Sequence, residues 1–339
     1  MIQRFKSLLS NKKFNLAGLI SIILFFPVQI TYAHVKWFID PNIIRTSHTS
    51  PSLVNFSNQA FVIWLIIIVL ATIVTGVIDH FFPIFKLDFF KSRRLSKDLI
   101  LRIFKFLIGV FLVVISLQWN IILTPEFPVN SAFNEFLRLI EAICGFLFIA
   151  NFAPLLAGFM LLFLYAMLGI FVDITALFEN LPLVGVFLII LFEFIDKKRN
   201  SNFLETWGIS LLRVSTGFAL IVLAFTEKLL DPDLSYAFLQ QHSWNFMHSF
   251  GFSNQLFVLS VGCAEILFGL IFLTGFITRV NTLAIAFFFA FSVVTMFVTT
   301  GKWEVEDMTV YASALLFLYF GSGAKLHLQK WLEHRPRLR

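Results

Sequence analysis

Three ionisable residues lie inside apolar stretches, where charged side chains are costly. Glu265 and Glu141 each stand about ten residues into such a stretch, and Arg213 lies about two helical turns into another. A carboxylate at the centre of a bilayer costs about 2.5–3.5 kcal/mol, so we expect these side chains to face protein or a water-filled cavity. They could form a structural ion pair between helices, or a site for protons or a quinone headgroup.

The heights of these residues in their helices suggest which of them pair. With a rise of about 1.5 Å per residue, Arg213 and Glu265 lie within about 10 Å of each other along the membrane normal. We therefore predict a buried ion pair between Arg213 and Glu265. For Glu141, Arg102 is a more distant candidate partner.

A second group of charges lies where apolar stretches end. Glu227 and Lys228 end the stretch 204–229, where charged side chains commonly extend to water and anchor a helix. Alternatively, they line an outer vestibule together with the residues of "WEVED". Those additional vestibule residues are Trp303, Glu304, Glu306 and Asp307.

Four histidines raise the question of a metal site. Basic residues and an apolar stretch precede Ala33, which resembles the end of a signal peptide. Cleavage there would make His34 the N-terminal residue, whose amine and imidazole could chelate copper with His48, His242 or His248. In the alternative, the helix is retained and His34 belongs to an interfacial anchor.

The two cysteines favour packing over chemistry. Cys144 and Cys263 are far apart, without a C-x-x-C motif or a Cys/His cluster, so a thiol redox pair and a structural zinc site lack their usual pattern. No apolar segment carries the pair of histidines that bis-histidine haem ligation would need.

The composition is that of a membrane protein. Of the 339 residues, 58% are hydrophobic and 14% are charged, whereas soluble domains carry about 25% charged residues. We predict ten helical segments, because a membrane-spanning helix needs roughly 20 apolar residues. The segments are 16–33, 60–82, 99–121, 133–150, 152–173, 182–195, 204–229, 255–275, 280–300 and 308–321.

The distribution of charge predicts an orientation. With the N-terminus in the cytoplasm, all but five of the 26 Lys and Arg residues lie on the inner side, as the positive-inside rule requires. The net charge of +6 is thus explained by membrane orientation and does not call for nucleic acid. The five outer cations are Lys36, Arg45, Arg138, Lys228 and Lys302.

An offset of 124 residues reveals an internal repeat. "EAICGFLFIANF" (141–152) aligns with "EILFGLIFLTGF" (265–276), which matches a Glu-x-x-x-Gly inside both spans. We interpret this as a tandem duplication of four-helix units, which keeps both units in the same orientation. The expected regions are 1–98 with two extra segments and a basic loop, 99–200 with the first unit, and 201–339 with the second unit and a basic tail.

The second unit resembles the DoxX/DoxD family of four-helix membrane proteins. The resemblance rests on "LLRVSTGFALIVLAFTEKL", "CAEILFGLIFLTGFITR" and "LYFGSGAKL". The matching residues are Arg213, Gly217, Lys228, Glu265, Gly269, Gly275, Arg279, Gly321 and Gly323.

The first unit resembles the same pattern more weakly. It has Arg102, Gly109, Glu141 and Gly145. Asn151 stands in place of the second glycine and Leu155 in place of the closing arginine.

The resemblance implies a fold and a general role. We expect an all-α polytopic membrane protein with two tandem DoxX-like bundles after two extra helices, in a bacterial-type inner membrane with both termini cytoplasmic. The family implies a subunit associated with a redox system, with an oxidoreductase partner, and one branch resembles a thiosulfate:quinone oxidoreductase subunit. Quinone binding is therefore one hypothesis that the resemblance implies, and the sequence alone names no cofactor. Two rival hypotheses are a transporter for a small solute or metal, and a non-catalytic scaffold for a partner enzyme.

Overall fold

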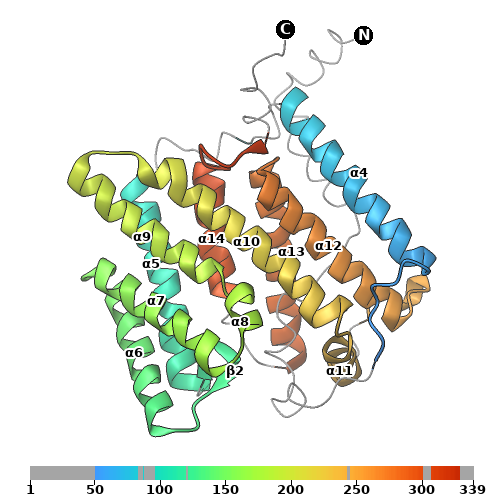
Figure 1. Ribbon diagram of the computed structural model, residues 1–339, viewed down its shortest axis with the longest axis horizontal. Coiled ribbons are helices and arrows are strands. Elements are labelled where there is room, and N and C mark those ends of the chain that lie inside the picture. Colours follow the sequence, from blue (N-terminus) through green and yellow to red (C-terminus); the bar gives the residue numbers. More distant parts are fainter. Residues whose placement is uncertain are drawn as a thin grey trace.

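The computed structural model describes residues 50–82, 87, 96–119, 121–242, 245–300 and 307–328. The described chain is helical except for one short hairpin (Figure 1). In the first half lie α4 (Gln59–Phe81), α5 (Lys97–Val114), η4 (Ile115–Trp119), β1 (Ile121–Ile122), β2 (Thr124–Pro128), α6 (Ala132–Ile149), α7 (Pro154–Phe171), α8 (Ile174–Glu179) and α9 (Pro182–Arg199). In the second half lie η5 (Leu204–Gly208), α10 (Ile209–Ala224), η6 (Phe225–Leu229), α11 (Asp233–His242), η7 (His248–Phe250), α12 (Asn254–Thr274), α13 (Thr278–Thr300) and α14 (Asp307–Phe320).

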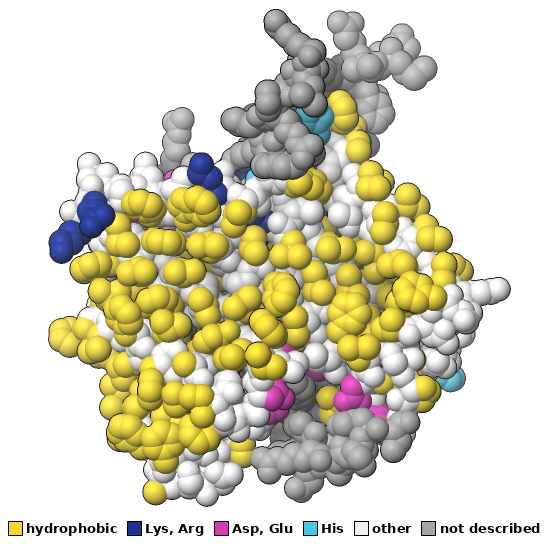
Figure 2. All heavy atoms as spheres, in the orientation of Figure 1, with side chains coloured by type: hydrophobic (Ala, Val, Ile, Leu, Met, Phe, Trp, Pro, Cys, Tyr) yellow, Lys and Arg dark blue, Asp and Glu magenta, His cyan; other side chains and the backbone are white. Residues whose placement is uncertain are grey.

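The predicted all-α membrane fold is confirmed. Each predicted segment from 60–82 onward corresponds to a helix, while the segment 16–33 lies outside the described residues. Within the described part, five helices are long and apolar enough to cross a membrane, and parts of α13 and α14 form shorter apolar helices. Figure 2 shows a broad band of hydrophobic side chains, with Lys and Arg above it and acidic residues near the opposite end.

Local sequence signals set the helix ends. The side chains of Asn58, Ser96, Ser131, Asp173 and Ser253 each accept a hydrogen bond from a backbone N–H of the helix that follows. These caps satisfy amide groups that have no partner within the helix. Proline begins both α7 and α9, where its missing N–H costs nothing.

Two helix pairs cross at glycines that let the backbones meet. A Cβ built on Gly109 in α5 would lie 2.6 Å from the carbonyl oxygen of Gly145 in α6. A Cβ on Gly217 in α10 would lie 2.6 Å from the carbonyl oxygen of Gly269 in α12. Small residues at crossings are typical of membrane helix pairs, because close backbones improve packing. These matching crossings support the duplication, which stays a prediction.

The helices of the two halves share one hydrophobic core. The last helix, α14, packs against α5, and α10 packs against α9. Phe104 and Leu112 of α5 belong to the same buried cluster as Leu212 of α10 and Leu316 of α14. The extra helix α4 packs against α12 and leaves most of its surface exposed, as a lipid-facing helix does.

Candidate functional site

Arg213 is fully buried, but the predicted pair with Glu265 is wrong. The guanidinium group instead binds carbonyl oxygens at the end of α12 and in the turn after α14. Carbonyls at a helix C-terminus have no partner within the helix, and a forked guanidinium can satisfy several at once. The acceptors are the carbonyl oxygens of Phe272, Leu273 (3.1 Å), Ser322 (3.0 Å) and Leu326 (2.6 Å).

The same arrangement recurs at the end of α14. Arg279 donates from Nε to the carbonyl oxygen of Leu318 at 2.7 Å and from Nη2 to that of Tyr319 at 3.2 Å. Each arginine lies against a glycine with positive φ: a Cβ on Gly275 would come within 3.1 Å of the Arg213 guanidinium carbon, and one on Gly321 within 3.3 Å of that of Arg279. These residues of the DoxX-like pattern therefore close helix ends.

Glu265 pairs with Lys228. The Lys228 ammonium lies 3.1 Å from Oε2 of Glu265 and 3.7 Å from Oε2 of Glu227. Glu227 and Lys228 are at most 1% exposed, so the expectation that they extend to water as an interfacial anchor is wrong.

Glu227 and Lys228 are buried because neighbouring segments cover the end of the helix that carries them. Ser235 of α11 donates to the carbonyl oxygen of Glu227 at 2.8 Å, and the backbone N–H of Leu53 donates to that of Leu229 at 2.7 Å. A cavity of about 10 Å³ beside Lys228 and Ser235 has room for about one water molecule. The cluster is thus enclosed within the protein.

In the first half, buried charge is arranged differently. Glu141 is completely buried, and its Oε1 accepts from the backbone N–H of Leu123 at 3.0 Å. Arg102 is exposed, so the suggested pairing with Glu141 is wrong. Lys105 is buried instead, and its ammonium lies 3.1 Å from Glu193 of α9. Lys105 was not predicted as a buried cation, although it stands four residues before the crossing glycine, as Arg213 does.

The hairpin beside Glu141 is an unusual element for a membrane protein. β1 and β2 form an antiparallel pair between α5 and α6, and Leu123 between them has φ +59°. A bulky residue with positive φ is uncommon and signals local strain. Irregular backbone at membrane depth occurs where it is buried in protein or lines a cavity. Here Leu123 is buried and also lines a pocket.

This pocket has a cavity volume of about 90 Å³ and lies between helices of both halves. It is close to the end of the molecule that carries β2, α8 and α11 (Figure 1). Apolar side chains form most of its wall, among them Phe111, Leu183, Val186, Leu220, Leu223 and Val310. Polar side chains at the wall include Thr124, Glu126, Glu179, Thr216, Thr309 and Ser313.

Two carboxyl groups of the pocket are held by hydroxyl groups. Thr226 donates to Oε1 of Glu179 at 2.6 Å, and Thr124 donates to Oε2 of Glu126. Glu179 ends α8 and is 5% exposed. Neither carboxyl group was predicted from the sequence, because α8 and the hairpin are too short to show a hydrophobic period.

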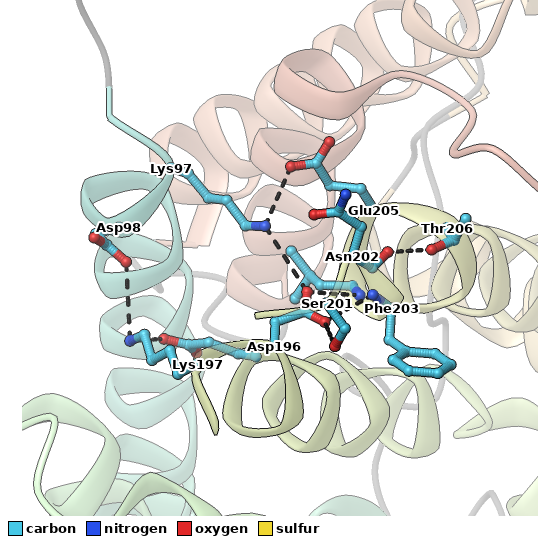
Figure 3. Close-up of polar contacts among 11 residues, drawn as sticks. Lys97, Asp98, Asp196, Lys197, Ser201, Asn202, Phe203, Glu205 and Thr206 are labelled. Carbon is cyan, nitrogen blue, oxygen red and sulfur yellow. Dashed lines mark hydrogen bonds and ion pairs between the residues drawn. The ribbon is translucent and has the colours of Figure 1, made fainter. Parts of the chain in front are cut away.

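A polar network on the opposite side fixes the turn between α9 and α10 (Figure 3). Asp196 accepts from the Ser201 hydroxyl at 2.8 Å and from the backbone N–H of Phe203 at 2.7 Å. Lys97 of α5 reaches Asp196 at 3.9 Å and Glu205 at 3.2 Å. The network joins the two halves at this end.

The remaining predicted sites are only partly described. Trp303, Glu304 and Glu306 of the vestibule, and His34 and His48 of the copper hypothesis, lie outside the described residues. Asp307 begins α14 and His242 ends α11.

Among the described residues, His248 is exposed, and no group of three or more His, Cys, Asp or Glu could hold a metal ion. The buried thiols of Cys144 and Cys263 are free.

Part of the chain matches the model of a known protein family. The DoxX family model matches residues 208–299, which run from the end of η5 into α13. No curated protein and no solved structure matches the chain. The chain thus carries a DoxX region in its second half, and the weaker resemblance of the first unit stays a prediction.

Proposed function

We propose that the protein is a membrane subunit of a redox system and binds a lipid-soluble quinone in the pocket between its halves. The DoxX match at residues 208–299 supports the redox association, since the family resemblance implies it. The proposal that the ligand is a quinone rests on the pocket. An oxidoreductase subunit that exchanges electrons with the bound quinone is the proposed partner.

The pocket has the chemistry that a quinone ring requires. Ligand sites are mostly apolar, with a few polar groups that fix orientation. The wall combines aliphatic and aromatic side chains with the hydroxyl groups of Thr309 and Ser313. We therefore propose this pocket as the site, and not Arg213 and Glu265, whose polar groups already bind other groups of the protein.

Filling the pocket tests this proposal. Leu220→Trp adds a bulky ring to the wall, and we expect at least about a tenfold loss of affinity for a short-chain benzoquinone. The matched control is Phe218→Trp on the same helix, because Phe218 is 37% exposed and is not a lining residue. Binding is measured by titration of the purified full chain, together with the quinone co-extracted from native membranes. Unchanged binding in Leu220→Trp would overturn the proposed site.

A transporter is the second candidate. Transport sites commonly lie between repeats, and this pocket lies between the halves and carries Glu126 and Glu179. Such a site would suit a small cation. Uptake of a cationic solute into vesicles, abolished by Glu126→Gln, would favour transport over redox function.

The proposed orientation places both termini in the cytoplasm of an inner membrane. The Lys and Arg residues seen on one side of the apolar band support it (Figure 2). Lys198 and Ser249 are exposed at opposite ends of the fold. We expect a membrane-impermeant thiol reagent, applied from outside, to label Ser249→Cys and to spare Lys198→Cys. The reverse pattern would invert the topology.

A further inference from the structure

We propose that Glu141 is a positioning residue of the pocket between the halves, because it holds the tip of the hairpin in the conformation that forms part of the wall. This inference rests on the proposed function and adds how the site keeps its shape. Glu141 is not itself a lining residue, so it acts on the pocket through the backbone of the hairpin.

The tip of the hairpin forms a continuous part of the pocket wall. Four consecutive residues, 123–126, line the cavity, whereas α6 supplies none of the lining residues among the described ones. The tip also lies inside the protein, since Leu123 and Thr124 are both buried. Any movement of this short segment therefore changes the shape of the pocket.

The backbone of the tip has a conformation that leucine does not favour. Ile122 pairs with Thr124, so Leu123 alone connects the two strands, and its φ is +59°. In this left-handed region a Cβ comes too close to the backbone, and such conformations persist only where the surroundings impose them. The tip therefore depends on contacts from neighbouring elements.

Glu141 provides such a contact at the strained residue itself. Its Oε1 accepts from the backbone N–H of Leu123 at 3.0 Å, and the Glu141 side chain is completely buried. A carboxyl group can accept a hydrogen bond whether or not it is ionised, so this contact does not depend on the charge of Glu141. Without the acceptor, the buried N–H would lose this partner, which penalises the native conformation of the tip.

A second side chain of α6 holds the other end of the hairpin. Asn134 donates from Nδ2 to the carbonyl oxygen of Pro128 at 3.1 Å and to Oδ1 of Asn130 at 2.8 Å. Asn134 and Glu141 are two helical turns apart, so they lie on the same face of α6, about 10 Å from each other along its axis. The hairpin is thus fixed against α6 at its base and at its tip.

The affinity for a quinone tests the position of the tip. If only a fraction of the molecules keeps the native tip, the apparent affinity falls by that fraction. Glu141→Met keeps the length of the side chain and removes the acceptor, so we expect at least about a fivefold loss of affinity for a short-chain benzoquinone. Glu141→Gln keeps an acceptor oxygen and should stay within about twofold of the unsubstituted protein. Each variant is titrated as the full chain, purified in lipid nanodiscs.

Two further variants and a second measurement complete the comparison. Cys144→Ala is the control for α6, because this buried thiol donates to the carbonyl oxygen of Ala157 in α7 at 3.1 Å. Asn134→Leu releases the base of the hairpin and replaces Glu141→Met should that variant not fold. Hydrogen exchange of the amides in 121–128, measured by mass spectrometry without ligand, reports on the hairpin directly. We expect faster exchange in Glu141→Met and unchanged exchange in Glu141→Gln and Cys144→Ala.

The outcomes separate this inference from the proposed function. Lower affinity and faster exchange in Glu141→Met, both restored in Glu141→Gln, support it. Unchanged affinity in Glu141→Met overturns it and leaves the quinone site standing, and unchanged exchange overturns it whether or not a quinone binds. An equal loss of affinity in Glu141→Gln or Cys144→Ala also overturns it, because the loss would then not depend on the acceptor. If the unsubstituted chain binds no quinone, the proposed function fails, whereas the exchange comparison still decides whether Glu141 holds the hairpin.

Discussion

The two glycine crossings share a backbone arrangement but differ in how they satisfy buried charge. In the α5–α6 pair, the cation four residues before the crossing glycine, Lys105, binds a carboxylate at 3.1 Å. In the α10–α12 pair, the cation at the same spacing, Arg213, binds only backbone carbonyls among the described residues. Both cations are at most 2% exposed.

The glutamates show the reverse pattern. Glu141 of α6 binds a backbone N–H of the hairpin at 3.0 Å, whereas Glu265 of α12 lies 3.1 Å from the ammonium of Lys228. Each stands four residues before a crossing glycine, Gly145 or Gly269. The crossing thus tolerates different partners for its buried charges.

This difference indicates what the geometry shared by the two helix pairs does. The glycines bring the backbones together in both pairs, while the partners of the buried charges come from different neighbouring helices, helix ends and, for Glu141, the hairpin. In the first pair the covering loop is a strained hairpin that also lines the pocket, so this half has a local structure that packing alone does not require. We propose on this basis that the first unit supplies the irregular backbone of the ligand site, while helices of both units form its wall.

The largest expected effect comes from removing the buried cations. Arg213→Met leaves several carbonyl oxygens at two helix ends without a donor, and we expect a loss of about 3–5 kcal/mol in the free energy of unfolding. Lys105→Met should cost about 1–3 kcal/mol, since Lys197 still contacts Glu193 at 2.8 Å. Unfolding of the purified protein by SDS, followed by circular dichroism, measures both.

Arg138→Met is the control for this pair of substitutions. Arg138 forms an ion pair with Glu135 and its side chain is 31% exposed, so its removal should cost less than about 1 kcal/mol. If Lys105→Met proved as damaging as Arg213→Met, the two cations would play equivalent structural roles and the contrast between the pairs would disappear.

The sequence predicted the helices and the burial of charge better than it predicted partners. Glu141, Glu265 and Arg213 are buried as expected, because their apolar surroundings make exposure to lipid costly. Height along a helix, however, does not say in which direction a side chain points. The Arg213 side chain reaches the ends of α12 and α14, and Lys228 takes the place beside Glu265.

The pocket could not be predicted from the sequence for a related reason. Its two carboxyl groups come from the hairpin and from α8, which has six residues and is too short to show a hydrophobic period. The run "LTPEFP" (123–128), with two prolines and a glutamate in an apolar region, was the available signal of irregular backbone. Only the fold brings this run beside α10 and α14.

The crossings themselves should give the intermediate effect. Gly269→Ala places a Cβ 2.6 Å from the carbonyl oxygen of Gly217, and Gly145→Ala places one 2.7 Å from that of Gly109. Because backbone must move in both cases, we expect each substitution to cost about 1–3 kcal/mol. Gly158→Ala is the matched control, since its nearest neighbour is the Phe187 ring at 3.3 Å.

The same SDS titration measures these variants. We expect Gly158→Ala to be neutral or slightly stabilising, because alanine favours a helix by about 0.5–1 kcal/mol over glycine. Tolerance of Gly145→Ala alone would show that the first crossing is looser than the second, and would weaken the case for a duplication.

The smallest effect is expected at the glutamates. Glu141→Gln keeps the oxygen that accepts from Leu123, and within the described part of the chain Oε2 of Glu141 makes no hydrogen bond. We therefore expect a loss below about 1 kcal/mol. Glu265→Gln removes the charge beside Lys228 and should cost somewhat more, about 1–2 kcal/mol, because Glu227 still lies 3.7 Å from that ammonium.

The same two glutamate variants also test where a quinone binds. Neither Glu141 nor Glu265 is a lining residue of the pocket, so both substitutions should leave the affinity for a short-chain benzoquinone within about twofold of the unsubstituted protein. Titration of both variants beside Leu220→Trp measures this directly. A large loss of affinity in Glu265→Gln, with Leu220→Trp unaffected, would indicate that the ligand binds beside Glu265 and not in the pocket.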